Sequence, residues 1–315
     1  MSTPLHARTL ALALGVLAGP ALAVGRIELS FNDPSALYSA YYADIQRVAT
    51  AAGNSWLDHF VDAAAPLSLG VQINFASIST ATGRSMTSAY LGDTASGQRL
   101  YAQGAAYEIK TGIDSNGAAM DIELTLGVDG YLQNELWFDP NPGQRAAPVP
   151  WNQTDAYSVL QHEFGHALGF NGWRDSTTGA LPADYLSTFD ELITVQTASS
   201  GTSVMHFTGA QSMASYGGPV PLTLDNYGHF GNWASSLGVD LVPDLMNGMG
   251  LQRGTRYAIS PLDLQVMQDL GLGSVSVSAV PEPATWLLWL GGLGALAASQ
   301  RKAGMRLNTR SATAA

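Results

Sequence analysis

The stretch His162-Glu163-Phe164-Gly165-His166 decides how the rest of this 315-residue chain is interpreted. Residues four apart lie on the same face of a helix, so His162 and His166 can direct their imidazoles at one metal ion. Glu163 lies beside them, where its carboxylate can take a proton from a water molecule that the metal holds. The motif therefore predicts an active-site helix with Glu163 as the general base.

The residues around the motif favour a helix of this kind. Thr154 or Asp155 can cap its start, and Gly169 can end it in a left-handed turn. Apolar side chains recur at helical spacing on the side opposite His162 and His166, which gives the helix one face for the core and one for chemistry. These apolar residues are Tyr157, Leu160, Phe164, Ala167 and Leu168.

Composition limits the kinds of protein and of metal site that this chain can form. The chain has no cysteine, which excludes disulfides, thiolate ligands and a cysteine nucleophile, so a metal site must use His, Asp or Glu. Hydrophobic residues make up 46% of the chain, enough for a sizeable core. The formal net charge of −11 argues against nucleic acid as a partner.

The first 23 residues have the pattern of a secretory signal peptide. A short polar start with Arg8 precedes an apolar run from Leu10 to Ala23, which closes on the small-residue sequence Ala21-Leu22-Ala23. We therefore expect residues 1–23 to direct export and to be removed.

The other end resembles the PEP-CTERM sorting signal of Gram-negative bacteria. Residues 280–283 read Val-Pro-Glu-Pro, and an apolar stretch over residues 284–298 and the basic pair Arg301-Lys302 follow. The order predicts a membrane stop with a cytoplasmic tail. The resemblance assigns residues 279–303 to the signal and 304–315 to a tail. It implies processing by an exosortase and a final location at the cell surface, in the extracellular matrix or in the medium.

Residues 24–278 predict one α+β domain between these ends. Asp33-Pro34 begins a first helix whose apolar residues continue to Ala52, and Gly53 closes it. Aromatic and apolar side chains of this helix should pack in the core. A second short helix is expected over residues 55–61.

The predicted strands form a single sheet. Alternating apolar and polar residues indicate strands over Val71–Phe75 and Met120–Leu126. A Ser/Thr-rich loop is expected between them, through about residue 98. Asp129-Gly130 is typical of a hairpin turn and predicts a third strand over Leu132–Phe138.

A catalytic zinc site usually has three protein ligands, so the motif needs a third. In the compact metzincin pattern it would stand six residues after His166, where this chain has Gly172. His6 lies in the signal peptide and His59 in an early helix, where a surface or packing role is expected. The remaining histidines are His206 and His229.

Local sequence favours His229 among these choices. Gly228 and Gly231 flank it, and a Gly-rich loop can approach a metal closely. His206 follows residues typical of a strand end. A third option is a carboxylate of Asp190-Glu191, which stand at about the distance at which gluzincins supply their third ligand.

Several downstream segments resemble the leishmanolysin-type branch of the metzincin metallopeptidases. The likeness covers residues 155–271 and maps the third ligand to His229 and the methionine of the Met-turn to Met246. It departs from that branch by lacking its cysteines and by carrying Phe230 where Trp is common. The segments are Phe207–Ala210, Ala214–Gly218, Val220–Leu222, Gly228–Phe230, Asp244–Gly248, Ile259–Asp263 and Gln268–Gly271.

The resemblance implies a metzincin-like zincin fold. A mixed twisted sheet would pack on the active-site helix, and a C-terminal subdomain would hold the Met-turn and a last helix. Residues 260–263 read Ser-Pro-Leu-Asp, which is typical of a capped helix start, and Gly271 can end that helix.

The function implied is that of an exported zinc endopeptidase acting on protein or peptide substrates. His162, His166 and His229 would hold Zn²⁺, and Glu163 would move the proton. A tyrosine could assist at the oxyanion, and Tyr216, Tyr227 and Tyr257 all remain open. The alternative is an inactive surface or exopolysaccharide-matrix protein that keeps the fold, although such a protein has no need of Glu163.

Overall fold

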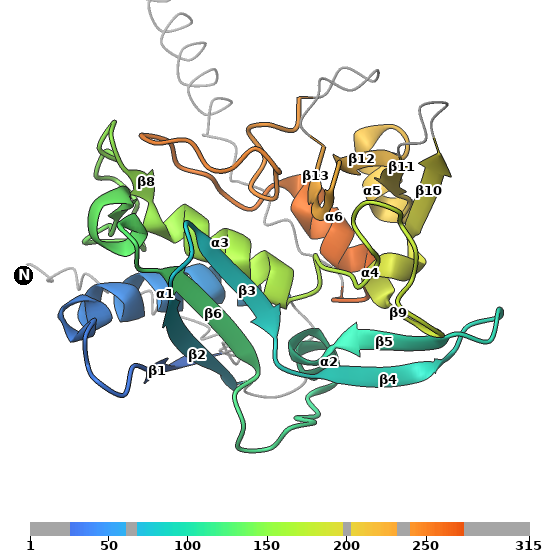
Figure 1. The fold of residues 1–315 in the computed structure, drawn as a ribbon, viewed down its shortest axis with the longest axis horizontal. Coiled ribbons are helices and arrows are strands. Elements are labelled where there is room, and N and C mark those ends of the chain that lie inside the picture. The colour runs from blue at the N-terminus through green and yellow to red at the C-terminus, as the bar shows by residue number, and fades with distance from the viewer. Residues whose placement is uncertain (1–25, 61–67, 198–202, 232–239, 274–315) are drawn as a thin grey trace, which may run out of the picture. The chain divides into compact units, whose positions relative to one another are not determined.

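A computed structural model describes residues 26–60, 68–197, 203–231 and 240–273 of the chain (Figure 1). These residues form a mixed α+β structure with several small sheets and few helices. The expected signal peptide and C-terminal sorting segment lie outside the described residues.

The largest sheet has four strands in the order β1-β2-β6-β3. β1 (Arg26–Asn32), β2 (Ser68–Ala76) and β6 (Ile122–Gly127) are parallel, and β3 (Ala81–Ser85) runs antiparallel to β6 at the edge. The predicted strands of β2 and β6 are confirmed, because their apolar residues alternate and are buried on one face. The sheet is mixed, as expected.

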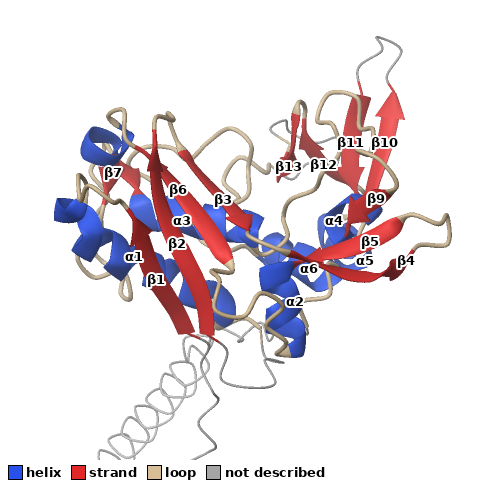
Figure 2. Ribbon diagram, turned by 60° about the horizontal axis from the view of Figure 1, so that its bottom comes forward, coloured by secondary structure: helices blue, strands red, loops and turns tan. Residues whose placement is uncertain are grey.

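Two helices cover one face of this sheet (Figure 2). They are α1 (Tyr42–Leu57) and α3 (Ala156–Ala167). The indole N–H of the fully buried Trp56 on α1 donates a 2.8 Å hydrogen bond to the carbonyl oxygen of Gln161 on α3. Gly53 stays within α1 rather than ending it, and a Cβ there would come within 2.8 Å of the Phe164 ring. This close packing holds α1 and α3 side by side on the sheet.

Short elements connect the main sheet to the rest of the chain. β4 (Ser88–Asp93) and β5 (Arg99–Gln103) form a hairpin that β9 (Tyr185–Ser187) extends, and α2 (Gly104–Thr111) follows β5 directly. A π-helical turn, η2 (Tyr131–Glu135), follows β6. The remaining pair is β7 (Leu136–Trp137) with β8 (Thr154–Asp155).

The later part of the chain builds a second four-stranded sheet, which is antiparallel. Its strands, in order, are β10 (Ile193–Thr197), β11 (Ser203–Phe207), β12 (Val220–Thr223) and β13 (Asn226–Phe230). The helices of this part are α4 (Thr188–Glu191), α5 (Ala210–Tyr216) and α6 (Pro261–Asp269).

The predicted last helix is confirmed as α6. The Ser260 hydroxyl accepts the Asp263 N–H, and the Asp263 carboxylate accepts the Ser260 N–H, which is a complete capping box. Pro261 stands at the start of the helix, where its missing N–H has no cost.

The first helix begins later than predicted. Asp33 does accept the N–H groups of Leu37 and Tyr38, but Ala36 has φ 52° and therefore breaks any helix through residues 34–41. Leu37 is 73% exposed rather than part of the core. One continuous helix, α1, ends at Leu57 and replaces both the first predicted helix and the second one, which was expected over residues 55–61.

The single predicted sheet and the hairpin after Asp129-Gly130 are wrong. The chain turns into η2 instead of a strand, and Leu136–Trp137 pairs with β8 rather than returning along β6. The predicted loop through residue 98 contains β3 and β4, which carry few apolar residues.

Candidate metal centre

The helix α3 holds two of the three histidines that converge in this protein. Asp155 caps its start, with its side chain accepting the Ser158 N–H. His162 and His166 are one turn apart on this helix, and Gly169 follows its end in a left-handed conformation with φ 130°. The sequence-based account of this helix, its cap and its end is confirmed.

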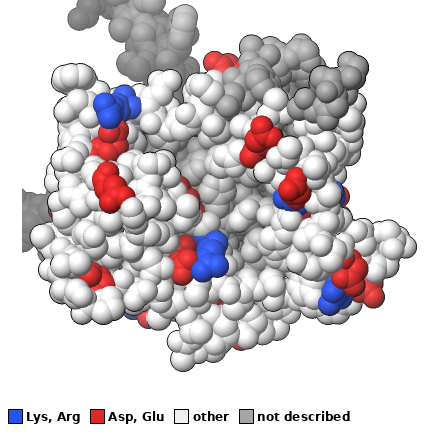
Figure 3. All heavy atoms as spheres, in the orientation of Figure 1, with Lys and Arg blue, Asp and Glu red and all other residues white. Residues whose placement is uncertain are grey.

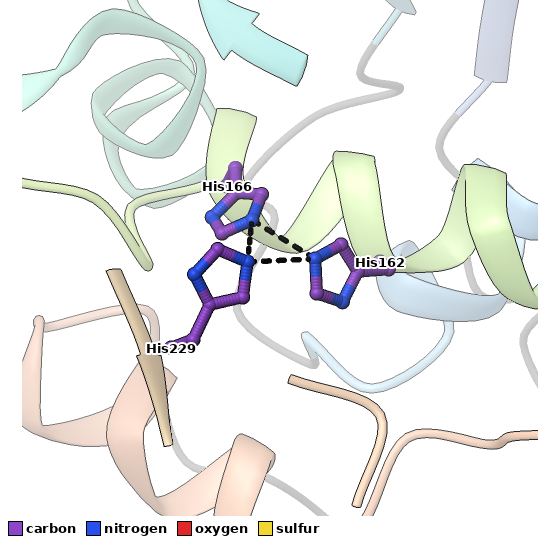
Figure 4. A group of neighbouring side chains, drawn as sticks. All are labelled: His162, His166 and His229. Atoms are coloured by element: carbon purple, nitrogen blue, oxygen red, sulfur yellow. Dashed lines mark hydrogen bonds between the residues drawn. The ribbon is translucent and has the colours of Figure 1, made fainter. Parts of the chain in front are cut away.

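The strand β13 brings the third histidine, His229, to the same point (Figure 4). The Nε2 atoms of His162 and His166 are 3.0 Å apart, and each lies 3.1 Å from Nε2 of His229. Figure 4 shows the three rings directed at one another from the helix and the strand. Three nitrogen atoms therefore form a nearly equilateral triangle.

The outer ring nitrogens face backbone carbonyl groups. Nδ1 of His162 lies 2.7 Å from the Leu245 oxygen, Nδ1 of His166 lies 2.8 Å from the Phe170 oxygen, and Nδ1 of His229 lies 3.4 Å from the Asn226 oxygen. A carbonyl oxygen only accepts, so each Nδ1 must donate and carry the proton. In the neutral rings, Nε2 then carries a lone pair, which is directed at the centre of the triangle.

The surroundings keep these imidazoles neutral. Burial lowers the pKa of His162 to about 3, with a further contribution from His166. Burial also lowers the pKa of His166 and His229. Three lone pairs that face one another at 3.0–3.1 Å repel, and a cation between them removes that repulsion.

The donor set fits a metal ion of the zinc class. Nitrogen ligands about 2.0–2.1 Å from a tetrahedral zinc ion are about 3.3–3.4 Å apart, only slightly farther than in this triangle. Histidine ligands in metal sites commonly donate their other N–H to a carbonyl, as His162 and His166 do here. The three residues can hold such an ion with a small outward shift of the rings.

Glu163 lies next to this triangle on the same helix and is 7% exposed. Burial raises the pKa of its carboxyl to about 8, partly offset by a hydrogen bond from the Gly83 N–H of β3. A Cβ at position 83 would overlap the backbone carbonyl of Glu163, so only glycine lets β3 approach α3 this closely. Gly83 was not singled out from the sequence, because an isolated glycine in a polar segment carries no signal of such a contact.

Met246 lies against α3 between the two histidines. It is fully buried, and a Cβ at Gly165 would come within 2.6 Å of its sulfur. The N–H of Phe230 donates to the Met246 oxygen at 2.8 Å, which joins the loop of Met246 to the strand of His229. Met246 therefore packs against the helix of His162 and His166 and is bonded to the strand of His229.

Side chains on neighbouring segments hold β13 against the chain that follows α3. The Tyr227 hydroxyl donates to the buried Asp190 carboxylate at 3.0 Å and accepts the Arg174 N–H at 2.6 Å. A Cβ at Gly172 would overlap both the Asp190 carboxylate and the Tyr227 hydroxyl. The space beside Gly172 is thus occupied by the side chains of Asp190 and Tyr227.

The other candidate third ligands lie elsewhere. His206 is on β11, where its neighbours on the adjacent strands are Thr194 and Pro221. Asp190 is engaged with Tyr227, Ser187 and Trp173. Among the described residues, the only histidine cluster that could hold a metal is His162, His166 and His229.

A cleft of about 1010 Å³ opens at the triangle and is lined by residues of both sheets. Residues 79–83, which include most of β3, form one wall, and Asp225 to His229 form part of another. Figure 3 shows the surface on this side hollowed near its centre, with sparse and scattered charged side chains. Tyr131 also lines the cleft, although it was not among the tyrosines considered from the sequence.

Comparison with known proteins identifies the C-terminal segment. A family model for the PEP-CTERM protein-sorting motif matches residues 279–302. Signals of this type direct export and surface anchoring in Gram-negative bacteria and imply processing by an exosortase. Within the described residues, no helix has the length and hydrophobicity to cross a bilayer.

No curated protein and no solved structure matches this chain. What the comparisons show is therefore a PEP-CTERM sorting motif at the end of the chain, attached to a mixed α+β domain in which three histidines converge.

Proposed function

We propose that this protein is an exported zinc-dependent endopeptidase with His162, His166 and His229 as metal ligands and Glu163 as general base. One observation carries the proposal. Three neutral imidazoles direct unprotonated nitrogens at one point, 3.0–3.1 Å from one another, beside a buried glutamate at the floor of a cleft. A protein that did not bind a cation there would have to bear the mutual repulsion of these groups.

The residues of the chain have separate tasks in this reaction. Zinc, when bound, would polarise the scissile carbonyl and make a water molecule easier to deprotonate. Glu163 takes the proton of the attacking water and delivers it to the nitrogen of the departing amine. Burial raises the pKa of Glu163 to about 8, and a cation held by the three histidines would favour the ionised carboxylate, which is the form that can accept a proton.

A peptide substrate suits the wall of the cleft. β3 is the last strand of its sheet, and residues 79–83 line the cleft beside Glu163. The outer edge of an edge strand offers N–H and C=O groups to which an extended peptide can add as a further strand, apart from the Gly83 N–H, which donates to Glu163. The substrate backbone would then lie along β3, with a peptide bond near the histidines.

The resemblance to metzincins of the leishmanolysin type supports the same conclusion. The buried Met246, the mixed sheet beside α3 and the capped helix α6 all agree with what that resemblance implies. The sorting motif at residues 279–302 fits an enzyme that acts outside the cytoplasm. We expect its substrates to be proteins or peptides at the cell surface or in the matrix.

The test is cleavage of a generic protein substrate by the purified zinc-loaded protein and by its Glu163→Ala variant. We expect the parent to cleave and the variant to bind zinc normally but to lose cleavage, by roughly a hundredfold or more, because the general base is missing.

Zinc bound by both proteins with cleavage by neither would contradict the proposal. That result would favour a non-catalytic surface or matrix protein built on a peptidase fold. Equal cleavage by both proteins would contradict the role of Glu163.

A further inference from the structure

One part of the proposed reaction lacks an assigned residue, namely the donor that faces the carbonyl oxygen as it becomes anionic. The tyrosines considered from the sequence do not suit this role. The Tyr227 hydroxyl is already bonded to Asp190 and to the Arg174 N–H. Tyr257 accepts the Gln252 N–H at 3.2 Å, and neither Tyr257 nor Tyr216 lines the cleft.

Tyr131 is a candidate for this role that the three other tyrosines do not fill. It begins the π-helical turn η2 directly after β6 and lines the same cleft as Glu163 and the three histidines. Such turns are rare and occur often at functional sites. Its ring is half-buried against the core, so the side chain has a restricted position.

Tyr131 and Glu163 line the same cleft, and Glu163 is one of two carboxylates whose charge acts on the Tyr131 hydroxyl. Burial raises the pKa of Tyr131, and the negative charges of Glu163 and Glu135 raise it further. The phenol therefore stays protonated and able to donate at any pH at which the enzyme would work. Among the described residues, no hydrogen-bond partner occupies this hydroxyl, which leaves it for a ligand in the cleft.

We propose that the Tyr131 hydroxyl donates a hydrogen bond to the oxygen of the scissile carbonyl as that oxygen gains negative charge. The inference rests on the proposed peptidase function and adds a catalytic residue to it. The proton stays on Tyr131 throughout, because the hydroxyl stabilises charge and transfers nothing. Such a donor acts on the transition state more than on the bound substrate, so it raises kcat with little effect on KM.

The test measures binding as well as turnover. Zinc-loaded Glu163→Gln protein, with and without Tyr131→Phe, is titrated by calorimetry with a phosphonamidate peptide and with the corresponding amide peptide. The phosphonamidate carries a tetrahedral anionic group where the amide carries a carbonyl. Tyr101→Phe, a half-buried tyrosine of β5 that does not line the cleft, is the matched control.

We expect Tyr131→Phe to weaken phosphonamidate binding by roughly tenfold or more and to leave amide binding unchanged within about twofold. In the protein that keeps Glu163, the same substitution should lower kcat by roughly a hundredfold without a change in KM. Tyr101→Phe should change none of these values.

Equal phosphonamidate binding with and without the Tyr131 hydroxyl would overturn the inference. A loss seen only when Glu163 is present would also overturn it, since Tyr131 would then act through the glutamate. Failure of the proposed function gives a different result, in which the parent protein cleaves no peptide and the Glu163→Gln protein binds no phosphonamidate.

Discussion

Two regions of the molecule supply the three converging histidines in different ways. In α3, His162 and His166 are one helical turn apart, so the helix alone places them together. His229 stands 63 residues after His166, on a strand of the second sheet, and only tertiary contacts bring it to the site. The three histidines converge where α3, whose spacing is set by the local sequence, meets β13, whose position depends on the tertiary fold.

The two regions are also held by different forces. α3 packs against β3, β6 and α1, and its Phe164 and Leu160 side chains are almost fully buried. β13 combines the buried Phe230 ring, which packs on Phe170, with polar contacts that include the bond of Tyr227 with Asp190 and that of the Phe230 N–H with the Met246 oxygen. Substitutions in the two regions should therefore affect metal binding and stability differently.

The largest expected effect comes from removing a histidine from either region. His162→Ala and His229→Ala should each lower zinc affinity roughly a thousandfold, because a three-nitrogen site loses a third of its binding free energy. Competition with a chelator of known affinity measures this. His206→Ala is the control and should bind zinc as the parent does. Full zinc binding by His229→Ala would show that the strand contributes no ligand.

A smaller effect is expected where α3 contacts Met246, whose backbone oxygen is bonded to β13. Gly165→Ala places a methyl group 2.6 Å from the Met246 sulfur and should lower the free energy of unfolding by about 1–3 kcal/mol. Denaturant unfolding of the zinc-loaded protein measures it. In a background of Met246→Ala the same change should cost much less, since the methyl then enters a cavity. Equal costs in both backgrounds would show that Met246 does not lie against α3.

The next effect concerns the hydrogen bonds that the Tyr227 hydroxyl of β13 makes with Asp190 and Arg174, called the Tyr227 clamp below. Tyr227→Phe removes a hydroxyl from the buried Asp190 carboxylate and from the Arg174 N–H, which should cost about 1–2 kcal/mol of unfolding free energy. Zinc affinity should fall by up to about tenfold, because His229 is two residues away. Tyr216→Phe is a matched control, since the buried Tyr216 hydroxyl has no hydrogen-bond partner among the described residues. An unchanged zinc affinity in Tyr227→Phe would mean that His229 is held without this clamp.

The smallest expected effect is a pH dependence of stability that arises at α2, outside both α3 and β13. Burial and the carboxylate of Asp121 raise the pKa of Glu108 on α2 from 4.5 to about 7. The folded state therefore holds a proton that the unfolded state releases above about pH 4.5, and stability falls as pH rises from there through about 7. Glu108→Gln should flatten this part of the stability curve by about 1 kcal/mol, after allowance for solvent screening. A curve as steep as the parent's would contradict the assignment.

The sequence predicted the parts of the site that depend on local periodicity. The helix with His162 and His166, its Asp155 cap, the strands β2 and β6 and the capping box of α6 all follow from spacing and end signals. It pointed to His229 through neighbouring glycines and a family resemblance, and the structure brings this residue to the other two histidines.

What the sequence did not predict depends on contacts between distant segments. β3 has few apolar residues, and it is a strand because β6 pairs with it and Gly83 lets it approach Glu163. Asp129-Gly130 has the composition of a hairpin turn, yet the chain enters a π-helical turn that places Tyr131 in the cleft. Neither the approach of β3 to Glu163 nor the placement of Tyr131 in the cleft can be predicted from the residues next to them in the sequence.

The most direct test of the central claim is an anomalous difference map of zinc-loaded crystals, recorded above and below the zinc absorption edge. The account predicts one peak about 2.0–2.1 Å from the Nε2 atoms of His162, His166 and His229. A peak bound by the two histidines of α3 without His229, or the absence of a peak between them, would contradict it.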